Sequence, residues 1–133
     1  MARALIDTSV ALLASADLAR ALQPYEEVAI SAATTAELGY GLYAAGADWE
    51  ERFRRQLRLE WLVGAFEELP LDHATALAFG KVAGLVARAG RQPRRRSFDL
   101  LIAAAAVAHG LPLITANPGD LRGAEALVEI RPA

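Results

Sequence analysis

Residues 3–9 read Arg-Ala-Leu-Ile-Asp-Thr-Ser, a short apolar run that ends at an acid. The run has the length of a short strand, and Asp7 stands directly after it. In open parallel sheets, ligands bind at the carboxyl ends of the strands, so this acid occupies a position typical of a site. A structural role remains open, because Asp7 or Thr8 could instead cap the first helix.

Helical and strand-like segments alternate along the rest of the chain. Apolar spacing predicts helices over 10–22, 34–45, 49–63, 73–89 and 98–109, with Pro24 as a stop signal, Asp72 as an N-cap and Gly110 after the last of them. Short apolar runs predict strands over 28–31, 66–71, 113–115 and 127–130, and residues 90–97 form the one obvious loop. This alternation predicts an α/β fold with a mainly parallel sheet covered by helices on both faces.

The size and composition of the chain favour one compact domain spanning residues 1–133. There is no cysteine, which excludes disulfides, thiolate metal sites and cysteine nucleophiles. No stretch approaches about 18 uncharged apolar residues, so a membrane span is not expected. The first residues lack the cationic-then-apolar order of a signal peptide, and we expect a cytoplasmic protein.

The net charge of −2 hides an uneven distribution. Residues 1–50 contain two basic and seven acidic side chains, whereas residues 51–100 contain ten basic and six acidic ones. This pattern is compatible with an acidic site next to a basic surface. A nucleic-acid partner is therefore not excluded by the total charge.

Two further acids open predicted helices. Glu37 follows Thr34 in the spacing of a capping box, so a capping role alone competes with a ligand role. Asp99 lies in the first turn of its helix, where an acid complements the helix dipole. The following residues 100–108 are uncharged and predict a buried helix. An ionised acid at its start needs a partner, which a metal ion would provide.

Asn117 and Asp120 follow the predicted strand 113–115, although both are also ordinary turn formers. All these positions fall at one edge of a parallel sheet, where converging carboxylates repel one another unless a cation lies between them. Oxygen ligands without nearby His or Cys suit Mg²⁺ or Mn²⁺. Such a cluster suits phosphodiester hydrolysis, because the ion polarises a phosphoryl oxygen and activates water. Thr8 and Thr115 flank the cluster and either support it or serve in turns.

A family resemblance emerges from these motifs taken in order. The segments Leu-Ile-Asp-Thr-Ser at 5–9, Thr-Ala-Glu-Leu at 35–38, Asp-Leu-Leu-Ile-Ala-Ala-Ala at 99–105 and His-Gly-Leu-Pro-Leu-Ile-Thr-Ala-Asn at 109–117 resemble the PIN-domain toxins called VapC. The resemblance runs from residue 4 to about residue 131. It implies a PIN-like three-layer α/β/α domain with a short central sheet.

The resemblance also implies an activity and partners. It points to a Mg²⁺- or Mn²⁺-dependent endoribonuclease that cuts tRNA or ribosomal RNA, with a VapB-like antitoxin encoded beside it. The motifs assign catalytic and metal-binding roles to Asp7, Glu37 and Asp99. The fourth position departs from many relatives, since Ala116 stands where they have an acid. The candidates for this fourth ligand position are Asn117, as a neutral ligand, and Asp120, as a charged one, either alone or together.

The remaining candidates concern binding. Four arginines lead into the helix of Asp99 and are expected to contact RNA phosphates, although acidic antitoxin residues could also meet them: Arg91, Arg94, Arg95 and Arg96. Aromatic residues at amphipathic spacing are expected in the core or at an interface: Tyr40, Tyr43, Phe53 and Trp61. The alanine-rich helices leave apolar faces for a homodimer or an antitoxin helix.

The sequence is also compatible with two alternative functions. A non-catalytic RNA- or protein-binding module could keep the fold without the chemistry. A phosphatase could use Asp7 as nucleophile or ligand. Aspartyl-phosphate chemistry is disfavoured because Lys81, the only lysine, lies in the middle of a predicted helix.

Overall fold

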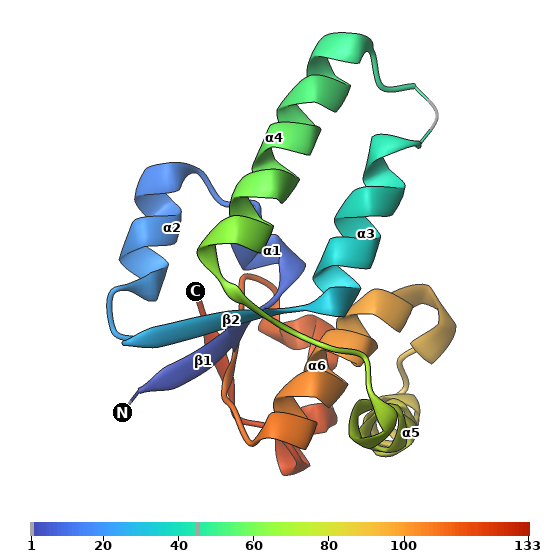
Figure 1. Ribbon diagram of the computed structural model, residues 1–133. Coiled ribbons are helices and arrows are strands. Elements are labelled where there is room, and N and C mark those ends of the chain that lie inside the picture. Colours follow the sequence, from blue (N-terminus) through green and yellow to red (C-terminus); the bar gives the residue numbers. More distant parts are fainter. Residues whose placement is uncertain (1, 45) are drawn as a thin grey trace.

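The computed structural model describes residues 2–44 and 46–133, apart from the side chains of Arg94 and Arg95. Figure 1 shows its helices and strands. In chain order they are β1 (Arg3–Ile6), α1 (Thr8–Ala11), α2 (Ser15–Leu22), β2 (Glu27–Ser31), α3 (Ala32–Leu42), α4 (Trp49–Ala65), β3 (Glu67–Leu69), α5 (His73–Arg88), the 3₁₀ helix η1 (Pro93–Arg96), α6 (Ser97–His109), β4 (Leu113–Thr115), the 3₁₀ helices η2 (Pro118–Leu121) and η3 (Ala124–Ala126), and β5 (Ile130–Pro132).

The strands form one parallel sheet in the order β3-β2-β1-β4-β5. β1 lies in the middle, and its Leu5 pairs with Ala29 of β2 on one side and Leu113 of β4 on the other. Because every strand runs the same way, all carboxyl ends share one edge. The α/β architecture with a parallel sheet is therefore confirmed, and that edge is where the predicted site residues can meet.

Helices cover both faces of the sheet, and the period of two along each strand determines which face a side chain meets. Leu5 and Leu113 pack under α5 and α6, together with Val82 and Val86 of α5. The neighbouring residues Ile6 and Ile114 face the opposite side. That side is covered by α1, α2 and α4, which contribute Val10, Leu18 and Leu62. The sheet is therefore the middle of three layers (Figure 1).

Helices α3 and α4 stand side by side and project above the sheet as an arm (Figure 1). Arg55 of α4 joins the two helices by donating from Nη1 to the carbonyl oxygen of Gly41 at 2.8 Å. Arg58 fastens α4 to the end of α1, because its guanidinium donates to the carbonyl oxygens of Ala11 at 2.8 and 3.1 Å and of Leu13 at 2.5 Å. The arm is thus fixed to the backbone at the end of α1, the helix that follows β1.

Several predicted boundaries were wrong. The helix expected over 10–22 is two helices, α1 and α2, separated by residues 12–14. The apolar periodicity continues across the break, so the spacing could not reveal it. Arg58, 45 or more positions away, takes the carbonyl oxygens that the break leaves free.

The strands at 66–71 and 127–130 were also misplaced. The first is shorter, Glu67–Leu69, and the last begins only at Ile130, after the 3₁₀ helix η3. The loop predicted over 90–97 contains the 3₁₀ helix η1, which begins at Pro93. Proline suits that first position, since its fixed φ is helical and it has no amide hydrogen to leave unpaired.

Helix ends agree better with the sequence. Asp72 caps α5, its Oδ1 accepting from the backbone amide of Thr75 at 3.0 Å, and Gly110 ends α6 in the left-handed region at φ 64°. Within the described parts of the chain, no helix is both long and apolar enough to span a membrane.

Candidate active site

Four acids meet at the carboxyl edge of the sheet. Asp7 follows β1, Asp99 lies in the first turn of α6, Asp120 lies in η2 after β4, and Glu37 projects from α3. Burial raises the pKa of the Asp99 carboxyl to about 6, and the negative charges of Glu37, Asp7 and Asp120 raise it in the same direction. The fold therefore brings these four predicted residues into one electrostatic cluster.

Asp7 is held rigidly in this cluster. Its Oδ1 accepts from the backbone amide of Val10 at 3.1 Å and from the hydroxyl of Ser9 at 2.5 Å, and the residue is only 7% exposed. The capping role predicted as an alternative is thus confirmed. Both of these hydrogen bonds use the same oxygen, so the cap leaves Oδ2 available for another partner.

Ser9 is a site residue that the sequence reasoning missed. Its hydroxyl donates to Asp7 and accepts from the backbone amide of Ala116 at 3.0 Å. It thereby ties the end of β1 to the turn after β4, two segments more than 100 positions apart. The only signal in the sequence was its place two residues after Asp7.

Glu37 does not cap its helix, and this corrects the capping-box interpretation. Helix α3 begins at Ala32, and its N-cap is Ser31, whose hydroxyl accepts from the backbone amide of Ala33 at 3.0 Å. Glu37 therefore lies in the second turn, too far along to cap. Its Oε1 is buried and has no hydrogen-bond partner among the described residues. An unpaired buried carboxylate oxygen is costly, so it indicates a missing cationic or donor partner.

The residues after β4 lie beside Asp7 and Asp99. A small cavity of about 30 Å³ is lined by Asp7, Ser9, Asp99, Thr115, Asn117, Asp120 and Leu121. Asp120 Oδ1 forms an ion pair with Arg96 Nη1 at 3.0 Å. Asn117 is exposed, and its backbone amide donates to the Thr115 hydroxyl at 3.0 Å. Both candidates for the fourth position thus border the same cavity.

The two threonines have structural partners. The Thr8 hydroxyl donates to that of Thr34 at 3.1 Å in a buried contact between α1 and α3. Thr115 serves the turn that follows β4. Of the two, Thr115 lines the small cavity, whereas Thr8 does not.

The predicted RNA-binding arginines divide into three cases. Arg96 pairs with Asp120 and lowers the pKa of Asp99, although more weakly than burial and the neighbouring acids raise it. Arg91 is half-buried. The side chains of Arg94 and Arg95 lie outside the described part of the structure. All four precede α6 in the chain, and the ion pair with Asp120 places Arg96 beside the acidic cluster.

The donor set fits a hard divalent cation. It consists of carboxylate and amide oxygens. Among the described residues, the buried Oε1 of Glu37 has no hydrogen-bond partner, and the raised pKa of Asp99 shows that its negative charge is disfavoured. As the side chains stand, no group of three or more His, Cys, Asp or Glu residues within the described chain has the arrangement of a metal site. Ion binding would therefore include side-chain movement that draws the carboxylates together.

Known proteins share this fold and much of this sequence. The PIN domain family model matches residues 4–124. Ribonuclease VapC5 from Mycobacterium tuberculosis is 38% identical over 116 residues, which are 86% of this chain and 82% of that protein.

Solved structures agree with this match. The structure of VapBC-5, a member of the VapBC family of toxin–antitoxin systems from Mycobacterium tuberculosis, has a TM-score of 0.78 at 32% identity, covering 99% of this chain and 98% of that one. FitAcB from Neisseria gonorrhoeae has a TM-score of 0.73 at 25% identity, covering 95% and 94%. With the acids after β1, on α3 and at the start of α6 held at one edge of the parallel sheet, the chain belongs to the PIN-domain family and, within it, to the VapC group.

Proposed function

We propose that this protein is a metal-dependent endoribonuclease and the toxin of a type II toxin–antitoxin pair. The observation that carries the proposal is the cluster of Asp7, Glu37, Asp99 and Asp120, in which burial and mutual repulsion raise the pKa of Asp99 to about 6. A divalent cation would relieve that repulsion and partner the free oxygen of Glu37. The name of the similar Ribonuclease VapC5 supports RNA as the substrate class.

Asp7, Glu37 and Asp99 would hold the ion, with Asp120 or Asn117 at a fourth position. Mg²⁺ is the natural choice for such oxygen ligands, with Mn²⁺ as the alternative. When bound, the ion supplies a Lewis acid that polarises the phosphoryl oxygen and lowers the pKa of an attacking water.

The residues of the chain supply orientation. Ser9 and the amide of Val10 fix the Asp7 carboxylate, so that its second oxygen keeps one direction. Arg96 restrains Asp120 beside Asp99 and sits where it can meet an incoming phosphate. RNA cleavage at this site would take place in the cytoplasm, with tRNA or ribosomal RNA as the expected target.

The test is RNA cleavage by purified protein with Mg²⁺ or Mn²⁺. Asp7→Asn and Asp99→Asn should each abolish cleavage, since each removes a ligand charge while keeping the side-chain shape. Asp17→Asn is the matched control, because Asp17 is exposed on α2 and, among the described residues, pairs only with nearby Arg20. Circular dichroism should show the same fold for all variants.

Two results would contradict the proposal. If Asp7→Asn and Asp99→Asn both cut RNA at the wild-type rate, the acids are not the catalytic site. If the wild-type protein binds RNA equally well without metal and cuts none of a total cellular RNA preparation, it is a non-catalytic binding module.

An antitoxin partner is the second element of the proposal. Similar solved structures are described as toxin–antitoxin systems. The arm carries a run of exposed apolar side chains: Tyr40 71%, Tyr43 84%, Trp49 74%, Phe53 58% and Leu57 49% exposed. The aromatic residues among them therefore do not belong to the core. A surface of this kind suits an amphipathic partner helix, and we assign it to the antitoxin.

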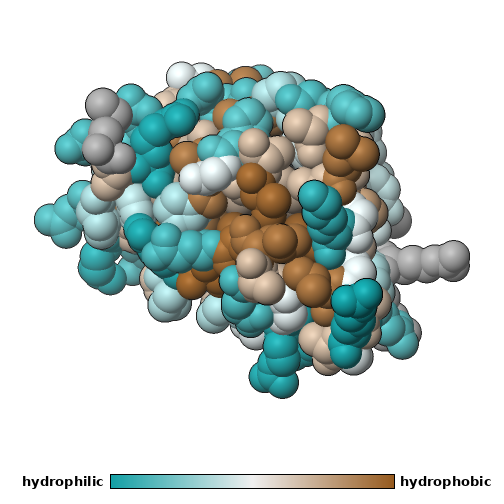
Figure 2. Space-filling view, turned by 90° about the horizontal axis from the view of Figure 1, so that it is seen from below, coloured by the Kyte–Doolittle hydropathy of each residue, from teal (hydrophilic) through white to brown (hydrophobic). Residues whose placement is uncertain are grey.

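A second copy of the chain is the third element. Figure 2 shows the face opposite the arm, where apolar side chains gather inside a hydrophilic ring. A groove of about 340 Å³ over α5 is lined by Gly80, Lys81, Gly84, Leu85, Arg88 and Leu127. A Cβ at Gly80 or Gly84 would meet no atom within 4 Å, so nothing within the described chain accounts for glycines there. Close packing of α5 against α5 of a second copy would account for them.

A further inference from the structure

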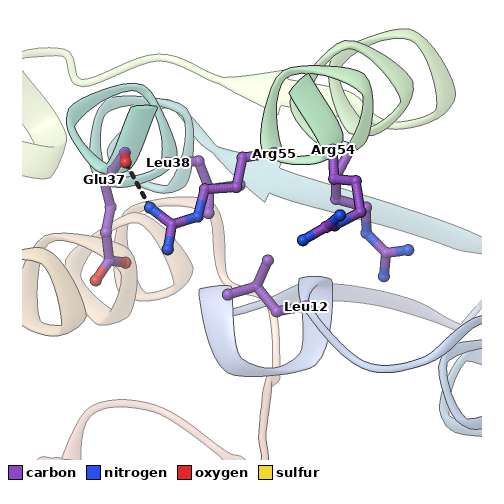
Figure 3. A pocket seen from close by; sticks show the side chains of 7 residues that line it. Leu12, Glu37, Leu38, Arg54 and Arg55 are labelled. Atoms are coloured by element: carbon purple, nitrogen blue, oxygen red, sulfur yellow. Dashed lines mark hydrogen bonds between the residues drawn. The ribbon is translucent and has the colours of Figure 1, made fainter. Parts of the chain in front are cut away.

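A pocket of about 360 Å³ lies between α1, α3 and α4, next to the acidic cluster. It is lined by Leu12, Glu37, Leu38, Gly41, Arg54, Arg55 and Arg58. Figure 3 shows Glu37 at one end of this pocket and Arg54 towards the other, with Arg55 and Leu12 between them. Glu37 lines this pocket, and its negative charge also raises the pKa of Asp99, so the pocket adjoins the acidic cluster.

Among the described residues, three arginines and one acid, Glu37, line the pocket, so its lining carries a net positive charge. Arg58 is held by the carbonyl oxygens of Ala11 and Leu13, which carry no net charge. Arg55 is held by the Gly41 carbonyl oxygen and by Glu51, with which it forms an ion pair at 2.6 Å. These contacts hold two guanidinium groups in place. The partners of Arg58 leave its charge unneutralised, whereas Glu51 offsets the charge of Arg55.

Arg54 differs from its two neighbours. It is exposed, and it has neither a hydrogen-bond nor an ion-pair partner among the described residues. A guanidinium presents five donors in a planar fork that matches the oxygens of a phosphate. Arg54 is therefore the free cation of this pocket.

We propose that this pocket binds a phosphate of the RNA substrate next to the scissile one, with Arg54 as its principal contact. The inference rests on the proposed ribonuclease function. In this arrangement the scissile phosphate lies at Asp7 and Asp99, and the strand on one side of it passes Glu37, which lines the pocket. The apolar wall of Leu12 and Leu38 offers a surface for the sugar or base, and the arginines meet the phosphate. An acidic protein segment could also meet arginines, but the position of the pocket next to the acidic cluster, with Glu37 common to both, favours the substrate.

The experiment compares Arg54→Gln with Arg52→Gln. Arg52 is exposed on the same helix, has no partner in the described chain and does not line the pocket, so both variants lose one positive charge of the same kind. Binding of a fluorescein-labelled single-stranded RNA is measured by anisotropy in EDTA over a range of salt concentrations.

Arg54→Gln should weaken binding by about fivefold, the upper range for one partly exposed ion pair. It should also reduce the slope of log affinity against log salt by about 0.7, the value for one phosphate contact on a single strand. Arg52→Gln should change neither quantity. With Mg²⁺ present, Arg54→Gln should raise KM about fivefold at an unchanged kcat, because the contact is made equally in ground and transition states.

Equal losses for the two variants would overturn the proposal, since only the total charge would matter. No loss for Arg54→Gln would overturn it as well. So would unchanged RNA binding together with weaker binding of the antitoxin, which would assign the pocket to an acidic protein segment. Because the binding is measured in EDTA, failure of the ribonuclease proposal would appear separately, as a wild-type protein that cuts no RNA with any divalent cation.

Discussion

The surroundings of Asp99 disfavour the charged form of its carboxyl group and raise its pKa. Desolvation is the largest cause of its raised pKa, and Glu37, Asp7 and Asp120 add to it. A folded-state pKa of about 6 against an ordinary value of 3.8 means that the folded protein holds the Asp99 proton more tightly than the unfolded chain does. Ionising Asp99 therefore lowers the stability of the folded state.

The first prediction at this scale concerns pH. Without divalent cations, the destabilisation should appear as the pH rises from about 4 to about 6 and be complete above that window. Asp99→Asn removes it, so the variant should match the wild type near pH 4 and exceed its free energy of unfolding at pH 7 by about 1 kcal/mol, a value discounted because the carboxyl is partly exposed. Urea unfolding at several pH values measures this. A stability difference that is constant with pH would contradict it.

Helix α3 shows at the element scale how a local motif can mislead. The Thr34 to Glu37 spacing is that of a capping box, but β2 runs straight into the helix, so Ser31 at the junction becomes the cap. Thr34 is then buried and accepts from the Thr8 hydroxyl. Glu37 moves to the second turn, where its carboxylate reaches both the acidic cluster and the arginine-lined pocket.

A pair of substitutions separates capping from ligation on this helix. Ser31→Ala should lower the free energy of unfolding by about 1 kcal/mol, because the amide of Ala33 loses its partner. Glu37→Gln should cause no comparable loss, since Glu37 caps nothing, yet it should impair RNA cleavage. Ser15→Ala on exposed α2 serves as the control for removing a serine hydroxyl. A larger loss of stability from Glu37→Gln than from Ser31→Ala would restore the capping interpretation.

Over the whole molecule, two apolar surfaces lie at opposite ends. The arm of α3 and α4 exposes aromatic side chains (Figure 1), and an apolar patch lies on the face opposite the arm (Figure 2). Leu77 of α5 is exposed, and the exposed Leu127 lines the glycine groove of that helix. Under the proposed function, the separation of the two surfaces would let one chain bind an antitoxin and a second copy at the same time.

Reciprocal substitutions test this division. Phe53→Asp should abolish co-purification with the antitoxin while leaving the self-association of the free chain unchanged, because Phe53 lies on the arm. Leu77→Asp on α5 should do the reverse. Co-expression with the neighbouring reading frame, followed by sedimentation analysis, measures both effects. A free wild-type chain that is monomeric at all concentrations would contradict the dimer, and tight antitoxin binding by Phe53→Asp would contradict the arm.

Much of this architecture follows from sequence order. Apolar runs alternating with helical periodicity predicted the parallel α/β fold. The family's local motifs, which are present in this chain, predicted Asp7, Glu37 and Asp99 as site residues, and that assignment stays a prediction. Local spacing also predicted the caps at Asp72 and Gly110, since each depends on neighbouring backbone groups alone.

Contacts between distant segments were decided only by the tertiary structure. Arg58 of α4 binds the backbone at the break between α1 and α2. Ser9, which is hydrogen-bonded to Ala116, orients Asp7. The place of Glu37 in its helix depends on where β2 ends and α3 begins. The arginine-lined pocket arises because α4 folds back over α1. The physical reason is common to all of them: periodicity reports which face of an element is buried, whereas the identity of the partner across that face depends on packing between residues far apart in the chain.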